Sequence, residues 1–296
     1  MFEFSIEYNE PLFRPPSEAH SLIFQVTLGC SWNKCAFCEM YSSKKFKTRK
    51  FDEIKSEIEN VAKEYTDVRK VFLADGNAMV LSFARLMEIL TELNKNFSKL
   101  NRISAYALPK DVFSKTKEEL IELKNAGLKL LYVGIESGDD EVLKMINKGE
   151  TYKSTLDGLR KAKEAGIKLS VMILNGLGGK KYSEQHAINS AKLVNEIKPE
   201  FLSTLVLSFP YGEDHFINKF KGDFVKMTKM NLINEMKIFI EKTNLESTIF
   251  RSDHASNYLV LKGILSRDKD EMLSRINRVL ENPEYSGLRE EWQRGL

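Results

Sequence analysis

The stretch Gly29-Cys30-Ser31-Trp32-Asn33-Lys34-Cys35-Ala36-Phe37-Cys38 holds all three cysteines of this 296-residue chain. A structural zinc site takes four protein ligands, and an electron-transfer [4Fe-4S] cluster takes four cysteines. Three thiolates close together leave one iron of such a cluster open to a substrate or a cofactor. The stretch therefore predicts a catalytic iron–sulfur cluster bound by Cys30, Cys35 and Cys38.

Two other interpretations of the cysteines stay open, a zinc knuckle and a set of buried thiols. No histidine or cysteine lies between Cys38 and His186, so a zinc site has no local fourth ligand. Clustered cysteines in a reducing compartment indicate metal binding more often than disulfides.

The bulk composition is that of an ordinary globular protein. Lys and Arg number 45 against 42 Asp and Glu, a balance too even to indicate a nucleic-acid partner. No apolar run reaches the length of a membrane span, and the charged residues near the N-terminus are not typical of a signal peptide. We expect a cytoplasmic protein without a membrane or nucleic-acid partner.

Outward from the cysteines, short apolar runs alternate with helical patterns. The runs cover residues 22–28, 70–74, 102–108, 128–135, 168–174 and 201–207. Between them Ile54, Ile58 and Val61 share one helical face, and Thr116 with Glu119 forms a capping-box pattern. Repeated βαβ units predict an α/β fold with a parallel sheet, either an open partial barrel or a doubly wound sheet. In both, the active site belongs at the carboxyl ends of the strands.

The pattern changes after Pro210. Residues 230–242 and 268–280 are predicted helices, and residues 249–259 are a polar island with apolar ends. A segment dense in hydrogen-bonding groups suits recognition of a polar substrate. The candidate substrate residues are Arg251, Asp253, His254, Ser256 and Asn257, and the alternative is a polar loop with a structural histidine.

The cysteine loop directly follows the first predicted strand, and Phe37 precedes the last cysteine. This arrangement resembles the C-x3-C-x2-C signature of the radical SAM superfamily, although this chain has one more residue between its first two cysteines. The resemblance implies two cofactors, a [4Fe-4S] cluster and S-adenosylmethionine (SAM) chelated to the open iron. It also implies cleavage of SAM by one electron to methionine and a 5′-deoxyadenosyl radical, which abstracts hydrogen from the substrate.

The resemblance also places SAM-binding residues at the ends of later strands. Asp75, Gly76 and Asn77 stand where family members have a Gly-Gly-Glu-like segment against the methionine amino group. Glu136 and Lys148 match the coproporphyrinogen-dehydrogenase branch, as ligands of the ribose and of the methionine carboxylate. Further candidates are Phe37, Tyr106 and Asn175. The alternatives are a strand-ending turn at 75–77 and a surface Glu and Lys.

The basic run at residues 44–50 has two interpretations. It is either a solvated loop, or a guide for an acidic electron donor or a phosphorylated substrate. The resemblance implies a flavodoxin or ferredoxin as the donor.

Taken together, these patterns predict a partial (β/α)6 TIM-like barrel over residues 18–210, after a lead at 1–17 and before a C-terminal helical extension at 211–296 that caps the substrate. The chain further resembles the small radical SAM lyases of queuine salvage, which release queuine from queuosine or its 5′-phosphate. Asp253, Glu213 or Asp214 would then accept from the guanine-like edge, and no catalytic side chain is assigned. The alternatives are an oxygen-independent porphyrinogen- or tRNA-modifying enzyme, and an iron–sulfur or zinc binding protein without catalysis.

Overall fold

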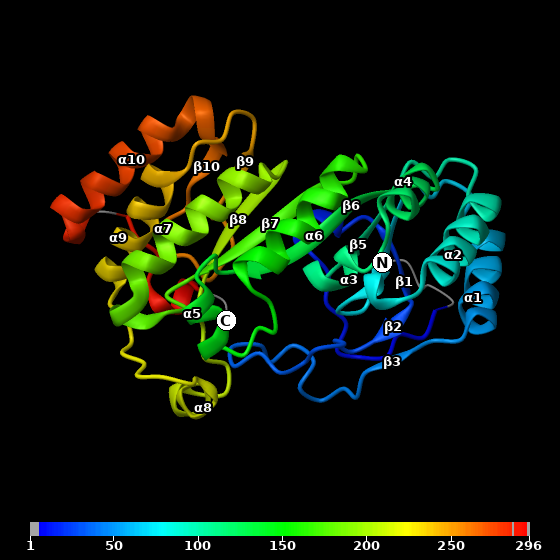
Figure 1. Cartoon of the computed structure of the whole chain (residues 1–296), viewed down its shortest axis with the longest axis horizontal. Coiled ribbons are helices and arrows are strands. Elements are labelled where there is room, and N and C mark those ends of the chain that lie inside the picture. Colours follow the sequence, from blue (N-terminus) through cyan, green and yellow to red (C-terminus); the bar gives the residue numbers. More distant parts are fainter. Residues whose placement is uncertain (1–5, 286, 295–296) are drawn as a thin grey trace. The chain divides into compact units, whose positions relative to one another are not determined.

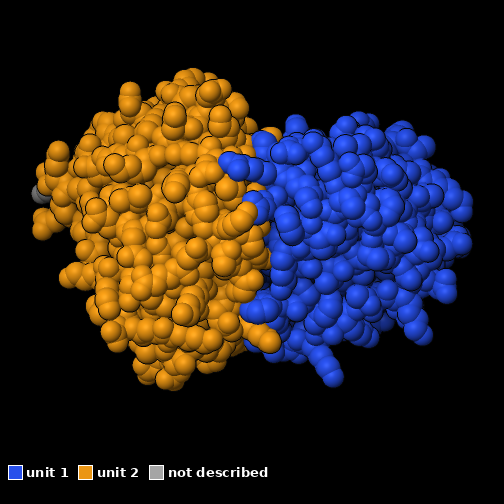
Figure 2. Space-filling view, viewed as in Figure 1, with its two compact units in different colours: residues 1–33, 40–133, 157–169 blue, residues 34–39, 134–156, 170–296 orange. Residues whose placement is uncertain are grey.

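The computed structural model of the chain describes residues 6–285 and 287–294. These residues form two compact units, coloured separately in Figure 2, and each is described by itself. Unit 1 holds the described residues up to 33 with 40–133 and 157–169, and unit 2 holds 34–39, 134–156 and those from 170 onward. Residues 1–5 of the predicted lead, and 286, 295 and 296 of the predicted C-terminal region, lie outside the described residues.

Unit 1 is built on a parallel sheet. Its strands follow the order β1 (Leu22–Gln25), β4 (Lys70–Ala74), β5 (Arg102–Tyr106) and β6 (Leu128–Glu136), of which the residues up to 133 belong to this unit. Leu22 pairs with Val71, and Val71 pairs with Ile103, so these strands run in register. Their carboxyl ends therefore share one edge, and each was predicted from its apolar run.

The predicted strand over residues 22–28 is interrupted. After β1 the chain forms β2 (Thr27–Leu28), which pairs antiparallel with β3 (Lys47–Thr48) in a separate two-stranded sheet. This short ladder joins the two ends of the segment that follows β2. The two ends of the cysteine-bearing loop are thus held together by the pairing of β2 with β3.

The helices of unit 1 follow the predicted faces. They are α1 (Phe51–Glu64), α2 (Phe83–Asn96), α3 (Pro109–Phe113), α4 (Lys117–Asn125) and the later part of α6 (Tyr152–Glu164), with 3-10 turns η1 (Pro16–Glu18) and η2 (Ala78–Val80). Ile54, Ile58 and Val61 are fully buried on α1, because they recur on one side of the helix. The predicted capping box is confirmed, since Thr116 and Glu119 each bond the other's backbone N–H.

Unit 2 contains β7 (Lys168–Asn175) from residue 170 onward, β8 (Phe201–Val206), β9 (Ile249–Arg251) and β10 (Lys262–Ile264), which are neighbours in that order. The first three strands are parallel, and β10 runs antiparallel to β9. The sequence did not indicate β9 and β10, because three residues are too few to show an alternating pattern. The C-terminal extension therefore holds strands as well as the predicted helices.

The helices of unit 2 are α5 (Asp140–Met145), α7 (Gly179–Ile197), α8 (Glu213–Lys219), α9 (Lys229–Lys242) and α10 (Leu265–Glu281), with the 3-10 turns η3 (Pro283–Tyr285) and η4 (Glu291–Gln293). Helix α9 packs against both α7 and α10 (Figure 1). Helices α9 and α10 confirm the predicted helices at 230–242 and 268–280, whereas α8 was not predicted. In the described part of the chain, no helix has both the length and the apolar composition that crossing a membrane requires.

Candidate functional site

The three cysteines follow β2, as predicted, and they fall in both units. Cys30 belongs to unit 1, whereas Cys35 and Cys38 belong to unit 2. Each is partly buried, and none of them forms a disulfide within the described residues. In unit 2 the backbone N–H of Cys38 donates to the carbonyl oxygen of Cys35 at 3.3 Å, so these two thiols lie on one tight turn.

In unit 1, Asp75 braces the start of the cysteine loop. Its carboxylate is fully buried, and Oδ2 accepts from the Gly29 backbone N–H at 3.1 Å and from Lys44 Nζ at 2.9 Å. Lys44 is therefore a buried ion-pair partner and not part of a solvated basic run. The sequence missed this pair because nothing in the pattern of lysines at 44–50 marks one of them as buried.

The other oxygen of Asp75 has a different surrounding. Asp75 Oδ1 and the Tyr41 hydroxyl are buried, and neither makes a hydrogen bond of acceptable geometry to a described residue. Burial, together with the Asp75 carboxylate, raises the pKa of Tyr41 above its usual range. A buried acceptor without a donor fits a ligand that brings an ammonium group, the role predicted for this segment.

Gly76 allows close packing against the first cysteine. Its N–H donates to the Gly29 carbonyl at 3.2 Å. A Cβ at this position would lie 2.7 Å from Cε2 of Tyr41 and 3.0 Å from Cβ of Cys30. Only a glycine permits this approach, so the strand end and the cysteine loop are in direct contact in unit 1.

Asn77 connects the same strand end to its neighbours. Its Nδ2 donates to Ser31 Oγ at 2.8 Å and to Asp111 Oδ2 at 2.6 Å, and its Oδ1 accepts from the Leu108 N–H at 3.2 Å. These bonds occupy the Asn77 side chain with protein partners. Tyr106, at the end of β5, packs edge-on against Phe72, with ring centroids 5.1 Å apart.

In unit 2, Glu136 and Lys148 form a buried ion pair. Lys148 Nζ lies 3.2 Å from Glu136 Oε1, and both side chains are only 6% exposed. Burial disfavours the ammonium, but Glu136 and the Cys35 and Cys38 thiols outweigh it and hold the pKa of Lys148 above its usual value. Lys148 Nζ also lies 5.7 Å from the centre of the Phe37 ring. The alternative of a surface Glu and Lys is excluded by this burial.

The backbone near Glu136 is shaped for this pair. Glu136 has a φ of 63°, in the left-handed region, and its side chain folds back over the strand. A Cβ on Gly134 would lie 2.0 Å from Glu136 Oε1 and 3.7 Å from Lys148 Nζ. Glycine at 134 is therefore what leaves room for the carboxylate and the ammonium.

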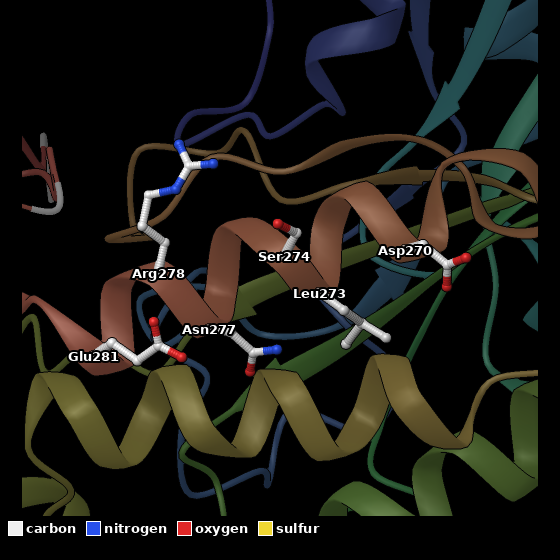
Figure 3. Close-up of a pocket in the computed structure, with 6 residues that line it drawn as sticks. All are labelled: Asp270, Leu273, Ser274, Asn277, Arg278 and Glu281. Atoms are coloured by element: carbon white, nitrogen blue, oxygen red, sulfur yellow. The ribbon is translucent and has the colours of Figure 1, made fainter.

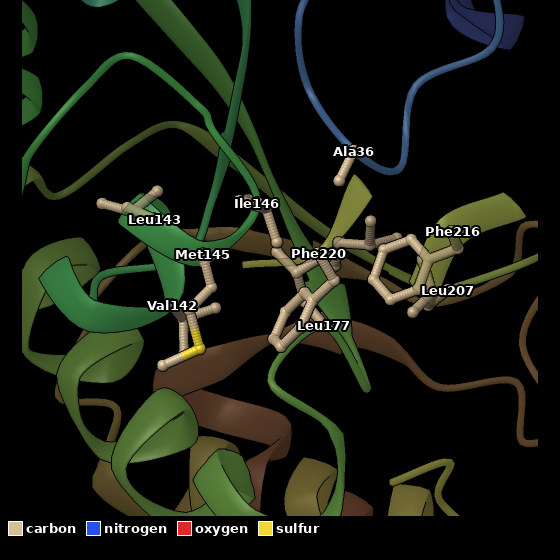
Figure 4. Packing of buried hydrophobic residues seen from close by; sticks show 10 residues of the cluster. Ala36, Val142, Leu143, Met145, Ile146, Leu177, Leu207, Phe216 and Phe220 are labelled. Carbon is tan, nitrogen blue, oxygen red and sulfur yellow. The ribbon is translucent and has the colours of Figure 1, made fainter. Parts of the chain in front are cut away.

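Two hydrogen bonds connect residues 34–39 of the cysteine segment to residues 146–147, which directly precede Lys148. The Ala36 N–H donates to the Ile146 carbonyl at 2.8 Å, and Asn147 Nδ2 donates to the Lys34 carbonyl at 3.1 Å. Figure 4 shows Ala36 among the buried side chains of unit 2. That cluster comprises Ala36, Val142, Leu143, Met145, Ile146, Leu174, Leu177, Leu207, Phe216 and Phe220.

The predicted substrate segment of unit 2 divides into buried and exposed residues. Ser256 Oγ accepts from the Val206 N–H at 3.1 Å, and Asn257 Nδ2 donates to the Thr204 carbonyl at 2.8 Å, so both anchor the segment to β8. His254 Nδ1 lies 2.9 Å from Ser256 Oγ, and burial lowers the pKa of His254. Arg251 and Asp253 are exposed.

A small pocket of unit 2 brings two of the predicted residues together. Asn175 and Asn257 line it with Val206, Leu232, Ile233, Met236, Tyr258 and Leu259. Asn175 Nδ2 lies 3.9 Å from Met236 Sδ, and Asn257 Oδ1 has no hydrogen-bond partner among the described residues. A second depression, in Figure 3, lies along α10 and contains none of the predicted residues. It is lined by Asp270, Leu273, Ser274, Asn277, Arg278 and Glu281.

Comparison with known proteins identifies the class. The radical SAM superfamily matches residues 24–194, more than half of the chain, so the chain belongs to this superfamily of enzymes. Its cofactors are a [4Fe-4S] cluster and S-adenosylmethionine, as predicted. The residues present fit these cofactors. The chain offers three thiols for the cluster, and for SAM the buried Lys148 ammonium and the buried Asp75 Oδ1, which has no hydrogen-bond partner among the described residues. In the described parts of the units, no three His, Cys, Asp or Glu side chains meet closely enough to hold a metal, so the three-cysteine ligand set stays a prediction.

Two relatives show which proteins of known name this chain is similar to. The tRNA-2-methylthio-N(6)-dimethylallyladenosine synthase of Chloroherpeton thalassium is 24% identical over 277 residues, which are 89% of this chain and 59% of that protein. Heme chaperone HemW of Bacillus subtilis is 25% identical over 127 residues, 42% of this chain and 34% of that protein. The chain thus spans less than two thirds of the length of either relative.

A solved structure supports the fold. Coproporphyrinogen III oxidase (HemN) from Escherichia coli superposes with a TM-score of 0.58 at 18% identity, covering 75% of this chain and 52% of that one. Together with the mostly parallel strands, this likeness confirms the predicted α/β fold of the partial TIM-like barrel kind.

Proposed function

We propose that this enzyme uses SAM and a cluster held by Cys30, Cys35 and Cys38 to abstract hydrogen from a small, polar, nucleoside-like substrate. Our first candidate is queuosine or its 5′-phosphate, with queuine as the released base. The observation that supports the radical chemistry is the buried Glu136–Lys148 pair. The Cys35 and Cys38 thiols act on its ammonium and help to raise the pKa of Lys148. The queuosine assignment rests on the resemblance to queuine-salvage lyases.

Each half of the proposed SAM site has a defined task. Lys148 would bind the methionine carboxylate, and Glu136 would accept from the ribose hydroxyls, because a carboxylate is a natural bidentate acceptor. Asp75 Oδ1 would accept from the methionine ammonium, while Asp75 Oδ2 keeps the loop in place. Tyr106, Asn77 and Asn175 are proposed as further walls of the site. On one-electron reduction, the bound cofactors supply methionine and a 5′-deoxyadenosyl radical.

The substrate would bind against the segment after β9. The exposed side chains available to it are Arg251, Asp253 and His254. The buried Ser256 and Asn257 bond the segment to β8. A carboxylate such as Asp253 accepts from the ring N–H and the exocyclic amine of a guanine-like base. Glu213 and Asp214 on α8 are the other candidates for this contact. In this proposal residues 18–210 form the barrel and 211–296 cap the substrate.

A second candidate is a tRNA- or porphyrin-directed radical SAM enzyme. It is favoured by the match to the tRNA-modifying synthase, which extends over 89% of the chain, and by the match to HemW. The two candidates differ in substrate and share the radical chemistry. A flavodoxin or ferredoxin is the proposed electron donor, and the cytoplasm is the expected location.

The test is anaerobic reconstitution followed by incubation with SAM and dithionite. Queuosine, its 5′-phosphate, unmodified tRNA and coproporphyrinogen III are supplied in separate reactions, and 5′-deoxyadenosine and free queuine are quantified by mass spectrometry. We expect 5′-deoxyadenosine and queuine in equal amounts with one queuosine form. If 5′-deoxyadenosine appears only with tRNA or the porphyrinogen, the second candidate replaces the first. If it appears with none and iron stays far below four per chain, the radical proposal is wrong.

A further inference from the structure

Unit 2 contains a buried acid–imidazole pair outside the proposed site. Glu235 on α9 and His186 on α7 are each 1% exposed, and His186 Nε2 lies 3.9 Å from Glu235 Oε1. Two titratable groups that are removed from water need partners that compensate for the lost hydration. The partners of this pair are on the turns that follow β6 and β7 and on helix α7.

Glu235 holds the turn after β7. Its Oε1 accepts from the Gly176 N–H at 2.6 Å, and its Oε2 accepts from Ser183 Oγ at 2.6 Å. Gly176 has a φ of 84°, and a Cβ there would lie 2.7 Å from Cδ2 of Leu232. The turn is therefore pressed against α9 and bonded to it, immediately after the proposed SAM residue Asn175.

His186 holds the turn after β6. Its Nδ1 lies 2.8 Å from Ser137 Oγ, which also accepts from the Asp139 N–H at 3.0 Å. One helical turn further along α7, Ser190 Oγ accepts from the Gly138 N–H at 2.9 Å. This turn directly follows Glu136, the proposed ribose ligand. His186 Nε2 has no hydrogen-bond partner among the described residues and faces Glu235.

We propose that Glu235 and His186 are positioning residues for SAM, which hold the turns after β7 and β6 so that Asn175 and Glu136 are presented in a fixed arrangement. This inference rests on the proposed roles of Asn175 and Glu136. In this proposal neither member of the pair touches the cofactor. Their effect is transmitted through the Gly176 N–H and the Ser137 hydroxyl.

The ionisation of the pair gives the proposal a signature. Burial raises the pKa of Glu235 to about 7, against the opposing effect of Ser183 and Gly176, and burial lowers the pKa of His186 to about 4. The titratable groups that face the pair are each other and Asp139, which acts on the imidazole. Around neutral pH, Glu235 therefore changes charge while His186 stays neutral. The ionised carboxylate accepts with both oxygens, so the Gly176 bond strengthens as the pH rises through about 7.

The experiment compares three variants of the anaerobically reconstituted enzyme with the wild type. Glu235→Leu removes both acceptors, Glu235→Gln keeps an oxygen for Gly176 but cannot ionise, and Glu241→Gln is the matched control on the exposed side of α9. The SAM Kd is measured by equilibrium dialysis at pH 6 and pH 8, together with iron content and circular dichroism. The ionisation of the SAM amino group is common to all variants and cancels in the comparison.

We expect Glu235→Leu to weaken SAM binding about tenfold at pH 8 with unchanged iron, because it leaves buried donors unpaired. Glu235→Gln should bind at both pH values within about threefold of each other after correction by Glu241→Gln, whereas the wild type binds more tightly at pH 8. If Glu235→Leu does not fold, the Glu235→Gln comparison decides alone. Wild-type affinity in Glu235→Leu, or unchanged pH dependence in Glu235→Gln, overturns the inference. If instead Lys148→Met and Glu136→Gln leave the SAM Kd unchanged, the proposed SAM site itself is wrong.

Discussion

At the scale of single residues, one carboxylate in unit 1 has two distinct surroundings. Asp75 Oδ2 is bonded to Gly29 and Lys44, and Oδ1 has no donor among the described residues. In the proposed SAM site, a carboxylate used in this way would couple the shape of the cysteine loop to ligand binding at the strand end. The sequence indicates only a role in ligand binding for Asp75 and not the contact with the cysteine loop.

Asp75→Ala should unfold the start of the cysteine loop. It leaves the buried Lys44 ammonium unpaired, and breaking a buried ion pair costs about 3–5 kcal/mol. We expect a lower free energy of unfolding in urea and less than half of the wild-type iron after reconstitution. Lys45→Ala, at an exposed neighbour, is the control. Equal losses of stability and iron in both variants would contradict the role of Asp75 in holding the start of the cysteine loop.

Lys148→Met should leave iron binding intact and weaken SAM binding by at least about tenfold, since it removes a charge-assisted contact. Lys144→Met, on the exposed side of α5, is the matched control. Equilibrium dialysis of SAM against both reconstituted variants checks this. Equal affinities would show that Lys148 serves only Glu136.

At the scale of elements, the cysteine segment of unit 2 is supported by a cluster of aromatic side chains. Phe216 on α8 packs against Phe209, Phe220 and Phe224, with ring centroids 4.8 to 5.5 Å apart. Glu39, next to Cys38, accepts from Lys219 Nζ of the same helix at 3.1 Å, and its Oε1 lies 2.9 Å from His215 Nε2. Helix α8 therefore belongs to the support of the Cys35–Cys38 turn, although its residues gave no sign of this in the sequence.

Phe216→Ala should lower the stability of unit 2 by about 3–5 kcal/mol, because it opens a cavity in a packed cluster. Hydrogen exchange over residues 34–39 should accelerate, since Ala36 packs in the same cluster. Phe113→Ala is the control, because that side chain is 50% exposed. Unchanged exchange at 34–39 would mean that α8 and the cysteine segment are independent.

At the scale of the whole molecule, stability depends on pH through buried groups that the sequence did not mark. The pKa of His186 is lowered to about 4 by burial, from an ordinary value near 6.5. Between pH 6.5 and pH 4, His186 is therefore protonated in the unfolded chain and neutral in the folded chain. This group's contribution is complete above about pH 6.5 and is lost as the pH falls through about 4.

Thermal denaturation between pH 4 and pH 7 should show this loss, which amounts to roughly 3 kcal/mol for this one group. His186→Gln keeps a side chain that hydrogen-bonds Ser137 and removes the titration. The wild type should lose more stability than the variant on acidification. Parallel curves for the two proteins would rule out His186 as the source.

Part of the fold was predictable because it depends on local chemistry. The apolar runs gave the strands β4 to β8 to within a few residues, since burial on both faces leaves a continuous signal. The sequence of the polar island did not indicate β9, because β9 and β10 are set by pairing with β8 and with each other. Similarly, Lys44, Glu235 and His186 look like any lysine, glutamate and histidine on a helix or loop, and their partners lie far away in the chain.

The sequence by itself determined the superfamily and its cofactors, because the cysteine cluster, the phenylalanine before its last cysteine and the spacing of the apolar runs are all local features of the sequence. Only the tertiary structure decided which polar side chains are buried and what they bind. It joined Glu136 to Lys148, Asp75 to Lys44 and Glu235 to Gly176, since the cost of burying a charge is settled by partners brought together in folding.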